Sequence, residues 1–163
     1  MRIYSVCLIS LIVLVSACKS PKETAGSATP GADVPSAIKA KRYVFQARNA
    51  IPTGGRNRQL SSGYTLEVTG DTLVAYLPYF GRAYTAPIDP SKGGIQFTSV
   101  NFDYTEQERS KGGWNIRIKP TDNREVRDFY LTISANGYST LQVNSINRQP
   151  ISFTGIIEPS KTR

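Results

Sequence analysis

The side chains of this sequence that could carry out acid–base chemistry are carboxylates, because the chain contains no histidine. That absence excludes Ser-His-Asp and Cys-His nucleophilic sites and every histidine-ligated metal site. The candidates for a pair of catalytic acids are Asp89, Asp103, Glu106, Glu108, Asp122, Glu125 and Asp128. Most of them lie in turns or in stretches of mixed charge, which is typical of solvated loops. We therefore predict no catalytic residues and no enzyme activity.

Asp103 differs from the other acids because it lies between Phe102 and Tyr104 in a stretch that we expect to be a strand. A polar residue on the outer face of the sheet is the simpler interpretation. The Lys-Gly-Gly turns at 92–94 and 111–113 are not placed between a strand and a helix, as a phosphate-binding loop would be. The sequence therefore indicates neither a cofactor nor a bound metal.

Basic residues exceed acidic ones, and the formal net charge is +8. The predicted signal peptide contains Arg2 and no acid, so the mature chain has a net charge of +7. Such a field favours anionic partners, including lipid headgroups, lipopolysaccharide phosphates and acidic glycans, and we expect no nucleic acid. Arg48, Arg56 and Arg58 cluster around a predicted loop at 52–55. The alternative is that this charge only keeps the surface soluble.

The first residues have the layout of a secretory signal peptide. Arg2 precedes a mainly apolar run at 3–15, which is too short to span a bilayer as a helix. The segment Val15-Ser16-Ala17-Cys18 resembles the lipobox of bacterial lipoproteins, in which the signal is cut before a cysteine that then carries lipid. We therefore predict lipidation at Cys18, which would anchor the chain stably through several acyl chains.

Three regions follow from this interpretation. Residues 1–17 are the signal peptide, 18–37 are the lipidated cysteine and a flexible tether, and 38–163 form one domain. Lys19 replaces the aspartate that typically retains enteric lipoproteins at the inner membrane. We therefore expect an outer-membrane lipoprotein that faces the periplasm rather than the cell surface.

The most distinctive stretch is Leu77-Pro78-Tyr79-Phe80-Gly81-Arg82-Ala83-Tyr84. Pro78 cannot donate to a central sheet ladder, so it either ends a strand or lies at an edge. Gly81 permits a sharp bend or a close approach of the backbone. The stretch therefore gathers aromatic side chains and one arginine at a corner of the fold.

Two interpretations of this corner remain open. In the structural one, Tyr79, Phe80 and Tyr84 plug one end of a barrel, and Arg82 satisfies backbone carbonyl groups. In the functional one, the same side chains line a barrel mouth where Arg82 and Arg148 hold an anionic group. These five residues are the candidate ligand-binding residues.

Three segments together carry a family resemblance: the 77–84 stretch, Gly63-Tyr64, and the segment at 147–155. Over residues 43–157 the chain resembles the bacterial lipoproteins described as domain of unknown function 4251. The resemblance implies a small secreted or lipid-anchored protein with a compact β-barrel that is similar in shape to lipocalins. It implies no established activity, so it assigns no catalytic residue.

The elements that must position these residues are strands. Turn signals at 69–72 and at Asn136-Gly137 separate alternating or β-branched runs, and the second pair favours a type I′ hairpin turn. We count eight or nine strands, without a long amphipathic helix. Sequential hairpins favour an antiparallel meander that closes into a small all-β barrel, and a two-sheet β-sandwich is the alternative.

Finer details complete the expected fold. Alternation over 114–119 predicts a strand whose Trp114 belongs to the core. The apolar phase changes between Phe97 and Val100, which a β-bulge would explain. Residues 105–111 could form one helical turn.

Two functions fit this chain. The first is a non-catalytic binding module whose barrel mouth holds a small apolar or anionic envelope molecule. The second is a structural or assembly lipoprotein that binds another envelope protein through a strand edge or an aromatic patch. An open, lined cavity would favour the first, and a filled interior with an uncovered edge would favour the second.

Overall fold

The structure is a computed structural model that describes residues 33–84 and 93–160. The predicted signal peptide, the predicted lipidation site Cys18 and the candidate acid Asp89 lie outside the described residues. No helix in the described ranges is long and apolar enough to cross a membrane.

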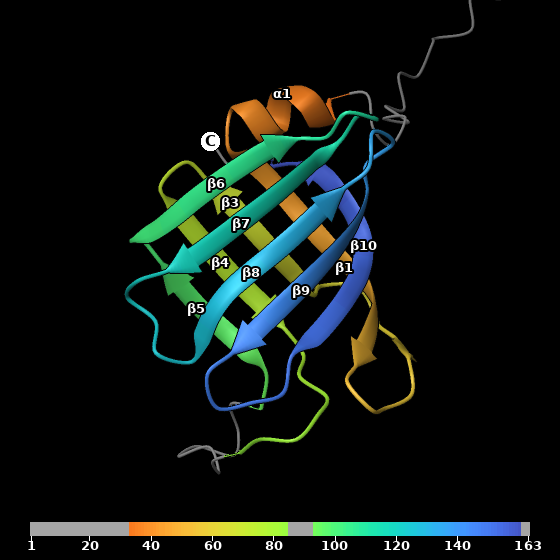
Figure 1. The fold of residues 1–163 in the computed structure, drawn as a ribbon, viewed down its shortest axis with the longest axis vertical. Coiled ribbons are helices and arrows are strands. Elements are labelled where there is room, and N and C mark those ends of the chain that lie inside the picture. Colours follow the sequence, from red (N-terminus) through yellow and green to blue (C-terminus); the bar gives the residue numbers. More distant parts are fainter. Residues whose placement is uncertain (1–32, 85–92, 161–163) are drawn as a thin grey trace, which may run out of the picture.

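The described chain forms one antiparallel sheet and one short helix. The elements are α1 (Val34–Lys39), β1 (Arg42–Pro52), β2 (Arg58–Gln59), β3 (Thr65–Thr69), β4 (Thr72–Leu77), β5 (Ile95–Ser99), β6 (Phe102–Glu108), β7 (Trp114–Pro120), β8 (Val126–Ile133), β9 (Tyr138–Ser145) and β10 (Ile151–Pro159). The strand order is β5-β4-β3-β1-β10-β9-β8-β7-β6, with β2 paired to β1. The sheet curls into a nearly closed barrel, as Figure 1 shows.

The barrel is an up-and-down meander, and its first and last long strands are neighbours. β1 pairs with β10 along most of its length, so hydrogen bonds join the first and last strands of the meander. The opening lies between β5 and β6, which follow each other across Val100 and Asn101. The predicted all-β barrel is confirmed, and a single continuous sheet replaces the alternative of two separate sheets.

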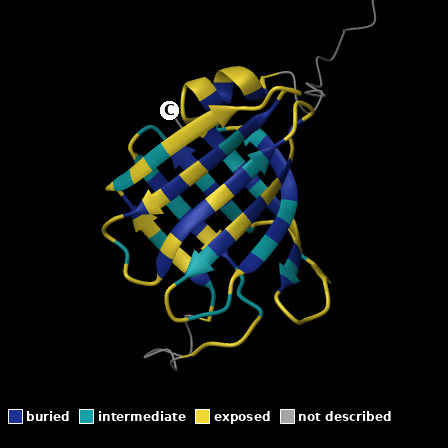
Figure 2. Ribbon diagram, viewed as in Figure 1, coloured by how far each residue is buried: buried dark blue, intermediate teal, exposed yellow. Residues whose placement is uncertain are grey.

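Alternation along the strands separates the inside of the barrel from the outside. In β7 the apolar residues are buried and Arg117 and Lys119 are exposed, and the same two-residue period is visible around the sheet in Figure 2. Trp114 is buried, as predicted. The inward side chains, among them Phe45, Phe129 and Phe153, form one continuous core. Side chains therefore fill the interior of the described barrel.

Helix α1 covers one end of this barrel. It buries Val34, Ala37 and Ile38 and contacts β1 and β10. Pro35 occupies the first turn, where its missing N–H removes no helical hydrogen bond. The tether predicted for residues 18–37 therefore overlaps a helix that packs on the core.

Three local predictions need correction. Residues 105–111 contain most of β6 rather than a helical turn, because residues 105–108 pair with β7 in the sheet. The phase change after Phe97 marks the bend between β5 and β6, which pair with different strands. In the predicted hairpin turn only Gly137 has a positive φ, 82°, so the turn is not type I′.

Side chains also link strands that are not neighbours in the sheet. The hydroxyl oxygens of Tyr43 and Tyr104 are 3.3 Å apart and join β1 to β6. Burial raises the pKa of Tyr104 to about 12, and it raises that of Tyr43 well above its usual value. Both hydroxyls therefore stay protonated at neutral pH. The rings of Phe97 and Phe129 stack with centroids 6.0 Å apart and connect β5 to β8.

Candidate functional site

The aromatic corner follows β4 directly. That strand ends at Leu77, immediately before Pro78, as the missing N–H of proline predicts. The hydroxyl of Tyr79 lies 2.9 Å from the carbonyl oxygen of Arg82 and 3.1 Å from that of Gln149. A Cβ at Gly81 would lie 2.7 Å from this hydroxyl, so the glycine permits the close approach. The corner is thus closed around the tyrosine.

The loop between β9 and β10 holds this corner through backbone hydrogen bonds, as neighbouring strands do. The N–H of Tyr84 donates to the carbonyl of Asn147, and the N–H of Gln149 donates to that of Arg82. The N–H of Arg82 lies 3.4 Å from the amide oxygen of Gln149. The two segments are more than sixty residues apart in the chain, and their pairing fixes the backbone on both sides of Arg82.

Arg148 belongs to the support of the corner. Its side chain is 11% exposed, and its guanidinium donates to the carbonyl oxygens of Gly93 and Gly94 at 3.3 and 3.2 Å. The guanidinium carbon of Arg148 lies 5.2 Å from the ring centroid of Tyr79. Its Nη2 atom lies 3.8 Å from Oε2 of Glu125. These contacts engage the charge within the protein, so Arg148 stabilises three segments of the chain.

A surface cleft with a volume of about 420 Å³ lies beside this corner, at the end of the barrel opposite α1. We call it the arginine cleft. Its lining residues are Pro52, Thr53, Gly54, Gly55, Arg56, Arg58, Phe80, Gly81, Arg82 and Gln149. They include three arginines and neither aspartate nor glutamate. The cleft therefore presents positive charge that its own walls do not neutralise.

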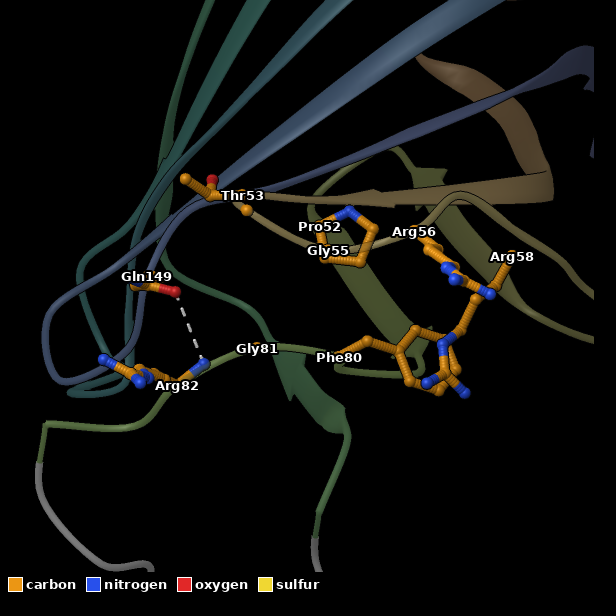
Figure 3. Close-up of a pocket in the computed structure, with 10 residues that line it drawn as sticks. Pro52, Thr53, Gly55, Arg56, Arg58, Phe80, Gly81, Arg82 and Gln149 are labelled. Atoms are coloured by element: carbon orange, nitrogen blue, oxygen red, sulfur yellow. Dashed lines mark hydrogen bonds between the residues drawn. The ribbon is translucent and has the colours of Figure 1, made fainter.

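Figure 3 shows how the charged groups are spread along the cleft. Arg56 and Arg58 lie at one end with Phe80, and Arg82 lies with Gln149 at the other. The guanidinium carbon of Arg58 is 4.7 Å from the centroid of the Phe80 ring, which is a cation–π contact. Within the described ranges, neither Arg56 nor Arg82 forms an ion pair.

The carboxylates of the described chain do not converge on this cleft. Asp128 accepts hydrogen bonds from Arg117 and Asn144, and Asp122 accepts from Ser99 and the N–H of Val100. Asp103, Glu106 and Glu108 are exposed on β6, as expected for Asp103. In the part of the chain that the structure describes, no group of three or more acidic, histidine or cysteine residues could hold a metal.

The five candidate residues from the sequence separate into different environments. Phe80 and Arg82 line the cleft. Tyr79 and Arg148 do not line it, and they hydrogen-bond to backbone carbonyl groups of the segments around it. Tyr84 is 69% exposed and is not among the lining residues.

Sequence reasoning did not assign Arg56 and Arg58 to the same site as Arg82. The signal available was their clustering at a glycine-containing loop, but their proximity to the corner depends on long-range pairing. No pattern in the sequence indicated that Arg148 donates to backbone carbonyl groups.

Comparison with known proteins identifies the family. A model described as domain of unknown function (DUF4251) matches residues 27–157. A similar solved structure is that of a DUF4251 family protein from Bacteroides eggerthii DSM 20697, with a TM-score of 0.58 and 16% identity. The match covers 78% of this chain and 85% of that one, and it supports the fold alone. No curated protein matches the sequence. With this barrel and a family match over most of its length, the chain belongs to the DUF4251 family.

Proposed function

We propose that the protein is a non-catalytic binding module of the cell envelope, and that its ligand is an anionic molecule held in the arginine cleft. The ligand is elongated and has an anionic group near each end. One such group meets Arg56 and Arg58, and the other meets Arg82. This arrangement follows the separation of the guanidinium groups along the cleft in Figure 3.

The observation that carries the proposal is the presence of three guanidinium groups on walls without a carboxylate. Arginine presents a planar fork of donors that matches carboxylate and phosphate oxygens. A hydrogen bond to a charged group contributes roughly 1.5–3 kcal/mol in proteins, and less where solvent screens it. Two or three such contacts can hold a small anion, and the ring of Phe80 supports the guanidinium group of Arg58 at one end of the cleft.

The filled interior explains why the ligand is placed outside the barrel. Phe45, Phe129 and Phe153 occupy the space that an apolar ligand would need in the centre of the sheet. The cleft at the barrel end is open to solvent and has hydrogen-bond donors. The proposal therefore favours an anionic ligand over a wholly apolar one.

The absence of catalysis is part of the proposal. The acids at Asp122 and Asp128 are engaged in hydrogen bonds within the protein. A hydrolytic carboxylate pair would need two acids on opposite sides of one cleft, and the lining of the arginine cleft has none. Binding without chemical conversion is the simpler use of such a site.

The envelope location is proposed from the sequence. Lipid on Cys18 would hold the domain at the outer membrane, facing the periplasm, and residues 19–32 would connect it to α1. The net positive charge of the mature chain would draw anionic envelope molecules towards it.

Native mass spectrometry tests this function. The chain is purified gently from the envelope and compared with an Arg56→Gln, Arg82→Gln variant and with an Arg109→Gln, Arg124→Gln control. The two arginines that are changed in the control are exposed and lie outside the cleft lining. We expect an added mass on the chain and on the control, and its loss from the cleft variant. If the parent chain shows only the mass of the unliganded protein after incubation with envelope extract, the result would contradict the proposal.

A second candidate function is the binding of another envelope protein, and one observation favours it. In the described sheet, β5 and β6 each pair with a single neighbour, so each leaves an edge for strand addition. Crosslinking in cells from positions on β6 would capture a partner under this alternative. Crosslinks that are absent from β6 but present from the loops of the arginine cleft would exclude it.

A further inference from the structure

A second hollow lies on the outer wall of the barrel, over β1, β8, β9 and β10. Its volume is about 470 Å³, and it shares no lining residue with the arginine cleft. β8, β9 and β10 lie side by side in Figure 1, and their register confirms that they are neighbours. We call this hollow the hydroxyl groove.

Two local irregularities shape the backbone beneath the groove. The register of β1 shifts between Ala47 and Asn49, so Arg48 and Asn49 are both exposed although they are adjacent in a strand. A Cβ at Gly155 would collide with the carbonyl oxygen of Gln46, so only glycine lets β10 approach β1 this closely. A bulge that faces a glycine bends the wall locally and turns part of a convex surface into a hollow.

A row of polar side chains crosses the groove from strand to strand. The register pairs Thr132 with Thr140, Thr140 with Thr154, and Thr154 with Asn49. Neighbouring strands are about 4.8 Å apart, so a ligand lying across them meets a hydroxyl or amide group at each step. Such groups both donate and accept hydrogen bonds, as the hydroxyls of a sugar do. The row has no charged residue.

The groove is lined by one aromatic side chain, Tyr138, and by one charged side chain, Arg48. Tyr138 is 60% exposed beside the row, so one face of its ring is available to a ligand. Arg48 also lines the groove, and its side chain forms no ion pair within the described residues. Neither aspartate nor glutamate is among the lining residues. The groove thus offers a flat apolar face, a line of neutral hydrogen-bonding groups and one cation.

We propose that the hydroxyl groove binds an acidic oligosaccharide. The ring of Tyr138 packs against the apolar face of one sugar, the threonine row and Asn49 hydrogen-bond to hydroxyl groups along the chain, and Arg48 pairs with a carboxylate. A nucleic acid would require several cations in line, and the groove has one. A buried apolar peptide would leave the hydroxyl row without partners.

Calorimetric titration of the full mature chain tests this site. The probes are a hexamer of galacturonic acid and maltohexaose, which is neutral. We expect the acidic hexamer to bind at least tenfold more tightly than the neutral one. Tyr138→Ala and Arg48→Gln should each weaken binding of the acidic hexamer by at least tenfold. Both side chains are exposed, so circular dichroism should show the variants folded.

Matched controls separate this site from general charge and from the arginine cleft. Tyr130→Ala removes another exposed tyrosine outside the groove lining, and Arg109→Gln removes another exposed arginine. We expect neither to change the affinity by more than twofold, and the Arg56→Gln, Arg82→Gln variant should bind the hexamer normally. Lack of binding by the parent chain, equal affinity for both hexamers, or undiminished binding by Tyr138→Ala would each overturn the proposal.

Discussion

The hydroxyl oxygen of Tyr79 lies 3.1 Å from the carbonyl oxygen of Gln149, and this contact joins the corner after β4 to the loop between β9 and β10. The same hydroxyl lies 2.9 Å from the carbonyl oxygen of Arg82. Burial raises the pKa of Tyr79, even though the nearby charge of Arg148 opposes the shift, so the hydroxyl remains a donor at neutral pH. One half-buried phenol thus fixes the backbone of an arginine that lines the cleft.

Tyr79→Phe tests this positioning role. The phenyl ring keeps its packing, and the two carbonyl oxygens lose their shared donor. We expect a loss of about 1 kcal/mol in the free energy of unfolding, measured by urea titration. We also expect weaker anion binding, although Tyr79 is not among the lining residues. Unchanged binding combined with lower stability would mean that the tyrosine supports the fold only.

The same substitution should affect stability much more at Arg148 than at Arg82. Arg148→Gln removes the donors to Gly93 and Gly94 and the charge over Tyr79, so we expect a loss of about 2 kcal/mol in stability. Arg82→Gln changes an exposed side chain, so stability should change by less than about 0.5 kcal/mol.

Binding separates the two arginines further. Fructose 1,6-bisphosphate has an anionic group at each end, whereas inorganic phosphate has one. We expect the parent chain to prefer the bisphosphate, and Arg82→Gln to remove that preference. Equal destabilisation by Arg82→Gln and Arg148→Gln would contradict the division of roles.

Asp128 should make stability depend on acid pH. Burial by itself raises the pKa of this carboxyl, but hydrogen bonds from Asn144 and Arg117, together with the charge of Arg117, lower it below its usual value. The unfolded state therefore takes up the proton first, so the stabilisation is present above about pH 4 and is lost as the pH falls below it. Asp128→Asn should cost about 1–2 kcal/mol at pH 7 and flatten the loss of stability between about pH 5 and 3. Parallel pH profiles of the two proteins would show that this carboxyl does not contribute.

Gly155→Ala tests the close approach of β10 to β1. Its Cβ would meet the carbonyl oxygen of Gln46, which belongs to the sheet backbone and not to a flexible side chain. We expect a loss of more than about 3 kcal/mol, or failure to fold. Gly55→Ala is the control, because its Cβ would meet only Pro52, at 3.3 Å. Similar thermal midpoints for both variants would argue against the tight contact.

Local signals in the sequence predicted much of the barrel. The turn around Gly70 and the one at Gly137 both join paired strands, because glycine accepts the positive φ that each turn requires. The short helix α1 had no such signal, since six residues gain their stability from burying Val34 and Ile38 against the sheet. The change in the phase of apolar residues before Val100 predicted a β-bulge. A bend into a strand that pairs with a different partner produces the same change of phase, so the sequence does not distinguish the two.

The candidate site was less accessible to sequence reasoning for a physical reason. Phe80 and Arg82 were recognisable as a local cluster, and Arg56 and Arg58 as another. The two clusters share one cleft only because β1 pairs with β10 and the corner after β4 pairs with the loop between β9 and β10. Nothing in the residue pattern distinguished Arg148, which contacts backbone carbonyl groups, from Arg82, which lines the cleft.

Calorimetric titration with fructose 1,6-bisphosphate at fixed ionic strength tests the central claim most directly. The parent chain should bind one equivalent, and the Arg56→Gln, Arg82→Gln variant should bind at least tenfold more weakly, which corresponds to about 1.4 kcal/mol. The Arg109→Gln, Arg124→Gln control has the same net charge as that variant and should bind like the parent chain. Equal weakening in the two variants would show that general charge attracts the anion, and it would contradict binding in the arginine cleft.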